Sequence, residues 1–488
     1  MTPSLLLTCV VVYSAVLFLI TYLTSRNATN ETYFIGNRSS KWYLVAYGMI
    51  GASLSGVTFM SVPGGVGPQH FAYFQMVLGY MVGYAVIATI LLPLYYRLNL
   101  TSIYSYLLQR FGAYSYKTGA FFFLLSRVIG ASFRLYIVVN VLQIFVFDEW
   151  GIPFTVTVAA FIVLILLYTF QGGVKTIVWT DTLQTTFMLL AVVITIYLIG
   201  KELNFSITDM ISNIKNRPHS AIFVTDFNDK KFFLKHFFGG AFIAIAMTGL
   251  DQEMMQKNIS CKTLKESQKN MFTFSIILFF VNIMFLCLGA LLYLFAAAKN
   301  IAIPVHSDDL FPTIALHFLG PVSGIFFIIG LISAAFPSAD GALTALTTSF
   351  CIDFIGIREK NWTEKKQVQV RRVVHLCFAI ILLLVIVYFK TSIKESVLNN
   401  LFTIANYTYG PLLGLFVFGL FTKLQVRDKL VPVIALFPPT ICYLLNTYSK
   451  ELFTSYQFGF EMLMINGLLT FIGLLLIAKY KIHPKVSL

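Results

Sequence analysis

The chain has 488 residues, of which 58% are hydrophobic and only 11% are charged. A soluble protein of this length carries charge on about a quarter of its residues, so the composition excludes an ordinary soluble fold and predicts an all-α polytopic membrane protein. The net charge of +14 does not indicate a nucleic-acid partner, because the basic residues are spread over short loops.

Membrane-spanning segments account for most of the sequence. One span needs about 20 apolar residues. The thirteen candidate segments are 3–25, 42–62, 70–98, 115–147, 152–170, 174–200, 233–256, 272–299, 319–347, 372–389, 396–422, 428–447 and 456–480. Several exceed the minimum length, which predicts tilted or broken helices.

The basic residues also predict an orientation. Most of the 35 Lys and Arg residues fall on alternate loops if the N-terminus lies outside the cell. Because cytoplasmic loops are enriched in these residues, we expect a multi-pass protein of the inner membrane with an outer N-terminus and a cytoplasmic C-terminus. The loop with Lys257, Lys262, Lys265 and Lys269 is one of the expected inner loops.

The second candidate span is dense in small residues and reads YGMIGASLSGVTFMSVPGG. Two interpretations stay open. Small residues allow close helix packing, or they form an unwound segment whose carbonyls face a cavity, as in broken transporter helices. In the second case Ser53, Ser55 and Thr58 would offer hydroxyls to a polar solute.

Two arginines lie inside the fourth candidate span. Arg127 and Arg134 are seven residues apart, which places them on one face of a helix. We expect Arg127 to form a structural ion pair or to extend toward the inner surface. Arg134 lies deeper, and it either forms a similar pair or meets an anionic group of a solute.

Asp181 follows a turn predicted at Gly172 and Gly173, and it enters the sixth candidate span. An aspartate at a helix start is usually a cap, but this position within the span favours a cation site.

Four polar residues at the end of the seventh span are interpreted as a helix end at the inner surface, with a gating role left open. They are Asp251, Gln252, Glu253 and Gln256.

The ninth candidate span contains the most unusual stretch, LISAAFPSADGALTALTTSF at Leu331–Phe350. It is rich in hydroxyls, Pro337 is expected to interrupt it, and Asp340 lies at its centre. A carboxylate at membrane depth costs at least ~2.5–3.5 kcal/mol and indicates function. Since hydroxyls, a carbonyl freed by proline and a carboxylate suit a hard cation, we predict a cation site here.

The eleventh candidate span contains a further helix-breaking pair, and the sequence as a whole contains no enzyme motif. The eleventh span contains Gly410-Pro411, which predicts a helix break or kink. No nucleophile elbow, HExxH motif, phosphate loop or dinucleotide-binding turn occurs in the sequence, so we do not expect an enzyme.

Six stretches, taken in order, resemble the sodium/solute symporter family. They read GNRSSKWYLVAYGMIGASLSGVTFMSVPG, LPLYYRLNLTSIYSYLLQRFG, GGVKTIVWTDTLQ, DQEMMQKNISCKTLKESQKN, the Leu331–Phe350 stretch with CIDF, and YGPLLGLFVFGLFTK. The resemblance implies the inverted-repeat (5+5) fold of the leucine transporter. The implied layout is an extra helix and linker at 1–35, a first repeat at 36–200, an outer loop at 201–232, a second repeat at 233–423 and two extra helices with a tail at 424–488.

The resemblance also implies site residues. The main sodium site would use the carbonyls of Gly51, Leu54 and Ala334 and the hydroxyl of Ser338. Pro337 stands where the family has a second hydroxyl. If the alignment of the ninth span with the family pattern is shifted by one residue, Ala335 replaces Ala334 and Ser338 is still included. A second cation site would use Asp181 and Asp340. The residues expected to bind the solute, including Arg134 from the pattern above, are Ser53, Ser55, Thr58, Tyr73, Phe74, Gln75 and Arg134.

The sequence therefore predicts a sodium-coupled symporter that imports a small polar organic solute by alternating access. The solute would be a sugar, sialic acid or another organic anion, and the stretch ASLSGVTFMSVPG is similar to the sialic-acid-transporting branch. Two alternatives stay open: a proton-coupled symporter that uses Asp181 and Asp340, and a transporter-like membrane sensor. The lipid bilayer is the expected environment, and we expect no nucleic acid and no obligate protein partner.

Overall fold

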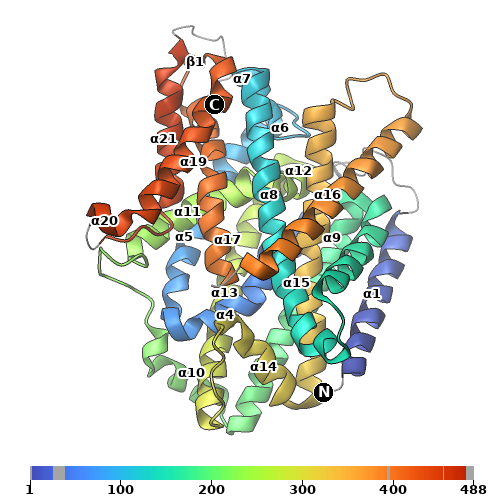
Figure 1. The fold of residues 1–488 in the computed structure, drawn as a ribbon, viewed down its shortest axis with the longest axis vertical. Coiled ribbons are helices and arrows are strands. Elements are labelled where there is room, and N and C mark those ends of the chain that lie inside the picture. Colours follow the sequence, from blue (N-terminus) through green and yellow to red (C-terminus); the bar gives the residue numbers. More distant parts are fainter. Residues whose placement is uncertain (1–2, 26–38, 393–395, 454–455, 480–488) are drawn as a thin grey trace.

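The computed structural model describes residues 3–25, 39–392, 396–453 and 456–479, most of which are helical (Figure 1). The helices of the first half are α1 Pro3–Ser25, α3 Trp42–Ser53, α4 Gly56–Gln69, α5 Tyr73–Val86, α6 Leu92–Arg97, α7 Ser105–Arg110, α8 Ala113–Leu142, α9 Phe154–Leu203 and α10 Ile207–Lys215. Those of the second half are α11 Phe233–Ala244, α12 Gln252–Ile259, α13 Leu264–Ala298, α14 Leu310–His317, α15 Gly320–Ser349, α16 Glu364–Ser392, α17 Val397–Thr408, α18 Gly410–Phe421, α19 Val431–Thr447, α20 Ser449–Phe453 and α21 Met462–Leu476.

Strands are confined to one short pair in the described part of the chain. β1 (Gln425–Val426) and β2 (Ala478–Lys479) are antiparallel and connect the segment before α19 to the segment after α21. Helices α19 and α21 lie at one edge of the molecule, whereas α1 lies at the opposite edge beside α9 (Figure 1). The extra helices expected at the two ends of the chain are thus peripheral.

Eight of the described helices are long and apolar enough to cross a membrane, and the number rises to ten if two bent pairs each count as one span. An all-α multi-pass architecture is confirmed, but the predicted count of thirteen is not. The difference has a physical origin, because apolar segments that the sequence shows as continuous are divided by breaks into helices too short to span alone.

Helix α15 forms the centre of the bundle. Every residue from 330 to 349 is buried, and α15 packs against α9, α8, α3 and α1. Small residues allow this close approach, since a Cβ at Gly330 would overlap Ala191 of α9. The expected interruption at Pro337 is wrong: the helix is continuous through this residue, because a proline removes only one helical donor and the surrounding helices hold the backbone in place.

In the described part of the chain, three apolar segments are broken into two helices each. α3 and α4 are separated at Leu54 and Ser55, and α17 and α18 meet at Tyr409 with a bend of 45°. Both breaks lie beside glycine or proline, Gly51 and Gly56 at the first and Gly410-Pro411 at the second, and they agree with the open interpretations given above. The third break, between the segment Phe233–Gly249 and α12, bends the chain by 66° and was not predicted.

Helix α9 contains the fifth and sixth candidate spans. The turn predicted at Gly172 and Gly173 is wrong, because the backbone is helical throughout Phe154–Leu203. At 50 residues, α9 is longer than a single membrane crossing requires. Asp181 therefore lies in the middle of one long helix, and the residues that follow it belong to the same helix.

The long loop after α9 contains the short helix α10. Its N-cap, Ser206, accepts a hydrogen bond from the Asp209 backbone N–H, and the Asp209 carboxylate accepts from the Ser206 hydroxyl at 2.6 Å and from its N–H at 2.9 Å. These bonds favour the charged carboxylate and hold the pKa of Asp209 below its usual value. The loop is therefore locally ordered by a capping box.

Candidate functional site

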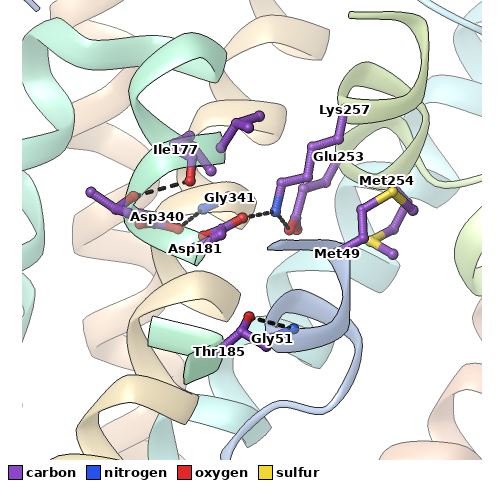
Figure 2. A network of polar contacts seen from close by, with 12 residues as sticks. Met49, Gly51, Ile177, Asp181, Thr185, Glu253, Met254, Lys257, Asp340 and Gly341 are labelled. Atoms are coloured by element: carbon purple, nitrogen blue, oxygen red, sulfur yellow. Dashed lines mark hydrogen bonds and ion pairs between the residues drawn. The ribbon is translucent and has the colours of Figure 1, made fainter. Parts of the chain in front are cut away.

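The break between α3 and α4 exposes backbone oxygens inside the bundle. No backbone N–H of a described residue donates to the carbonyl of Gly51 or Leu54, because Ser55 leaves helical geometry. The Gly51 N–H instead donates to Thr185 Oγ1 of α9 at 3.0 Å, which fixes the end of α3 against α9 (Figure 2). The two carbonyls predicted to bind sodium thus lack helical partners.

Helix α15 packs against both halves of this broken span, and it carries Ala334 and Ser338, the other two residues predicted for the sodium site. The Ser338 hydroxyl is fully buried and has no hydrogen-bond partner in the part of the chain that the structure describes. Ser333, one turn earlier, differs because its hydroxyl donates to Tyr13 of α1 at 2.7 Å. We call the carbonyls of Gly51, Leu54 and Ala334 and the hydroxyl of Ser338 the oxygen cradle.

A group of buried charges lies one turn further along α15, where Asp181 and Asp340 appear side by side (Figure 2). The Lys257 ammonium of α12 lies 2.7 Å from Asp181 Oδ2 and 3.2 Å from Glu253 Oε1. Both carboxylates and the ammonium are almost completely shielded from solvent. The cation that lies against Asp181 in this structure is therefore a lysine side chain.

Arg127 of α8 belongs to the same group of buried charges. Its guanidinium forms an ion pair with Glu253 and a second, at 3.5 Å, with Asp251. Asp251 caps α12 by accepting from the N–H groups of Glu253 and Met254. We call Asp181, Glu253, Lys257, Arg127 and Asp251 the charged cluster. The structural ion pair expected for Arg127 is confirmed.

Gly341 makes room for the charged cluster. A Cβ atom at this position would overlap Glu253 Oε1, so only glycine lets the carboxylate lie against α15. The Gly341 N–H donates to Asp340 Oδ1 at 2.5 Å. Asp340 and Gly341 thus meet the cluster on the same turn, two and three residues beyond Ser338.

A cavity of about 70 Å³ lies beside the α3–α4 break. Its lining combines hydroxyls, aromatic rings and two guanidiniums. The predicted solute residues that line it are Ser53, Ser55, Thr58, Tyr73 and Arg134. Arg134 is buried and forms no ion pair with any described residue.

Two residues predicted to bind solute lie elsewhere. Gln75 accepts a hydrogen bond from Val224 N–H at 3.1 Å and donates to the Lys231 carbonyl at 3.0 Å, so it ties α5 to the long loop. Phe74 packs against Phe279. Neither side chain borders the 70 Å³ cavity.

Sequence reasoning missed the two residues that dominate the cluster. Lys257 was expected on an exposed inner loop and Glu253 at a polar helix end, yet both are buried. Lys262, Lys265 and Lys269 are exposed as expected for loop residues. One sequence signal was available, since Glu253 and Lys257 have the i,i+4 spacing of a helical ion pair.

A model of the sodium:solute symporter family matches residues 33–427. The chain belongs to the sodium:solute symporter family. Sodium is thus its coupling ion and symport its mode of transport. The family and the structural neighbours are membrane transporters and not enzymes.

Individual relatives of this symporter are distant in sequence. The sodium/iodide cotransporter of Homo sapiens is 24% identical over 404 residues, which is 80% of this chain but only 61% of the relative. The sodium/sialic acid symporter NanT of Aliivibrio fischeri is 23% identical over 470 residues, or 92% of this chain and 89% of the relative. SiaT of Proteus mirabilis, also a sodium/sialic acid symporter, is 21% identical over 430 residues, covering 84% and 83% of the two chains.

Solved structures share the fold of the symporter. The substrate-bound, outward-open Na+-coupled sialic acid symporter superposes with a TM-score of 0.81 at 20% identity and covers 98% of this chain and 99% of its own. Mhp1, a nucleobase-cation-symport-1 family transporter in a closed conformation, gives a TM-score of 0.51 at 14% identity and covers 92% and 93%.

Proposed function

We propose that this symporter imports a small organic anion together with sodium. One observation carries the proposal: Arg134 borders the cavity without an ion-pair partner among the described residues, although its side chain is buried. A buried guanidinium without a counter-ion is costly, and a carboxylate entering the cavity would pair with it through two parallel hydrogen bonds. The neighbouring hydroxyls of Ser53, Ser55 and Thr58 suit the polar groups of such a solute.

The names of the relatives support an anionic solute. NanT and SiaT are named for sialic acid, and the human relative is named for iodide. The sodium-coupled monocarboxylate transporter 1 of Xenopus laevis is 25% identical over 404 residues, which is 80% of this chain and 63% of the relative. Although these solutes differ in size, each carries a negative charge.

We assign sodium to the oxygen cradle. Two carbonyls without helical donors and a buried hydroxyl without a partner supply oxygen ligands of the kind that a hard cation prefers. This arrangement supports the prediction for Gly51, Leu54, Ala334 and Ser338. A role for Asp340 in binding a cation stays a prediction.

The repeat layout is part of the proposal. Segments 36–200 and 233–423 would form the two inverted repeats, and each begins with a broken helix: α3–α4 in the first and α11–α12 in the second. Broken helices in corresponding positions of two repeats are typical of transporters with a central binding site. The exposed Lys262 on the loop after α12 and Lys265 and Lys269 at the start of α13 support a cytoplasmic location for this region and an inner-membrane protein whose N-terminus is outside.

A second, larger cavity of about 720 Å³ lies between the ends of α4, α11, α17 and α21. Phe402 lines the small cavity and Phe460 lines the large one, and their ring centroids are 5.3 Å apart. We infer that this ring pair closes the solute cavity on that side. Since a water molecule occupies about 10–15 Å³ on this scale, the 70 Å³ cavity must widen for a sugar-sized acid, as alternating access requires.

Transport into proteoliposomes tests the proposal. We expect an inward sodium gradient to drive uptake of labelled sialic acid or lactate, but not of glucose, and potassium to be ineffective. Arg134→Gln should lower anion uptake on the order of 10- to 100-fold, the effect of losing a charge-assisted hydrogen bond.

The matched control is Lys299→Gln, because Lys299 pairs with Glu202 on the surface at 3.1 Å, away from the cavity. Its uptake should equal that of the wild type. Equal transport of glucose and the acids, or no acid uptake under either gradient, would exclude an anion as the solute. Uptake that follows a proton gradient without sodium would favour the proton-coupled alternative.

A further inference from the structure

The position beside Asp181 already holds a positive charge. Lys257 Nζ is 2.7 Å from Asp181 Oδ2, and both side chains are almost completely buried. A metal ion bound by the same oxygen would lie within a few ångströms of the ammonium, where like charges repel strongly because little water screens them. Lysine and sodium therefore compete for this carboxylate.

The remaining ligands at this position are few. The other oxygen, Asp181 Oδ1, has no hydrogen-bond partner among the described residues, but one carboxylate oxygen is far fewer than the roughly six that a hard cation takes. Glu253 cannot add its oxygens freely, because Oε1 accepts from Lys257 and the carboxylate also pairs with Arg127. The Glu253 oxygens are thus committed to side-chain cations, and the Asp340 carboxylate beside Asp181 accepts a hydrogen bond from the Gly341 N–H.

The packing around the ammonium is specific. Gly341 leaves the space that the Glu253 carboxylate fills, and Glu253 in turn holds Lys257 from the side opposite Asp181 (Figure 2). Residues from α9, α12 and α15 thus combine to place one ammonium between two carboxylates. Lys262, five residues further along the chain, is exposed and shares none of these contacts.

We propose that the Lys257 ammonium is a built-in cation that takes the place of a second sodium ion at Asp181, so that one sodium ion, bound at the oxygen cradle, drives each transport cycle. The proposal rests on sodium coupling, but it does not depend on the identity of the solute. It assigns Lys257 as the residue that sets the sodium stoichiometry.

The test is a measurement of sodium binding to the purified, full-length symporter in detergent, without any solute. Radiolabelled sodium gives the number of ions bound per chain, and sodium-dependent thermal stabilisation gives the Hill coefficient. We expect one ion and a Hill coefficient near 1 for the wild type. Lys257→Ala, which frees Asp181, should bind two ions with a Hill coefficient approaching 2, whereas the surface control Lys262→Ala should match the wild type.

A double variant keeps the test decisive if Lys257→Ala does not fold. Asp181→Asn combined with Lys257→Met removes both charges together and should still bind one sodium ion, with an affinity within about threefold of the wild type. Two ions on the wild type, one ion on a folded Lys257→Ala, or no ion on the double variant would each overturn the proposal. Since no solute is present, failure to transport an organic anion would leave this result standing.

Discussion

The oxygen cradle and the charged cluster meet α15 one helical turn apart, yet they hold opposite kinds of groups. The carbonyls of Gly51 and Leu54 and the hydroxyl of Ser338 are neutral, and none of them has a hydrogen-bond donor or partner among the described residues. Asp181, Glu253 and Lys257 are charged and bind one another. Net charge is therefore a poor guide to ion sites in a bilayer: charges that pair with one another have no need of an ion from water, whereas neutral oxygens without a donor are open to one.

The largest expected effect comes from breaking the charged cluster. Arg127→Ala leaves the buried carboxylates of Glu253 and Asp251 without their guanidinium. Removing one partner of a buried ion pair costs about 3–5 kcal/mol. We therefore expect a large drop in the thermal unfolding temperature of the purified protein in detergent.

An exposed ion pair provides the control. Lys299 and Glu202 are 3.1 Å apart, but their side chains are 43% and 50% exposed. Such pairs contribute only about 0–1 kcal/mol, so Lys299→Ala should unfold near the wild-type temperature. Equal losses in the two variants would mean that the charged cluster does not stabilise the fold.

A smaller effect is expected when the space beside the cluster is filled. Gly341→Ala forces the Glu253 carboxylate away from α15, and overpacking of this kind costs about 1–3 kcal/mol. Displacing the Glu253 carboxylate would also weaken its ion pair with Lys257. We expect a lower unfolding temperature and a changed sodium-binding curve.

Gly130→Ala is the matched substitution in α8. Among the described residues, its Cβ would have one neighbour within 4 Å outside its own helix, Leu401 Cδ1 at 3.9 Å. Alanine also favours a helix by up to about 1 kcal/mol. This variant should be as stable as the wild type or more stable. If Gly341→Ala behaved in the same way, Glu253 would not need the space at Gly341.

The sequence predicted the parts of the molecule that depend on local patterns. Apolar length identified the membrane helices, and glycine or proline marked the breaks at Leu54 and Tyr409. The break before α12 follows Gly249 and contains no proline, and Asp251 caps the helix that starts there inside the bundle. A single sequence does not separate such a cap from an ordinary helix end at the membrane surface.

The charged cluster escaped sequence analysis for a related reason. Charged residues at the end of an apolar run are normally placed in water, and Lys257 was placed there. Its partner Asp181 lies on α9, 76 residues earlier in the chain. Only the bend before α12 returns Lys257 to the core, so the pair is a product of tertiary structure, whereas Asp181 and Asp340 were recognisable as unusual from their positions alone.

The last prediction concerns the oxygen cradle and has the smallest effect on stability. Ser338→Ala removes a buried hydroxyl that has no partner among the described residues, so the fold should lose little. If this hydroxyl binds sodium, the half-saturating sodium concentration for transport should rise roughly tenfold, the change that about 1.4 kcal/mol produces. Both alignments of the ninth span with the family pattern include Ser338, so the prediction holds for either one.

Ser333→Ala is its control, and the two variants should show opposite behaviour. Ser333 loses a hydrogen bond to Tyr13, which costs about 0.5–1.5 kcal/mol of stability, but its sodium dependence should match the wild type. A sodium dependence that changes at Ser333 and not at Ser338 would move the ion out of the cradle. The opposite result would place it there, because the Ser338 hydroxyl has no hydrogen-bond partner among the described residues whose loss would explain a changed sodium dependence.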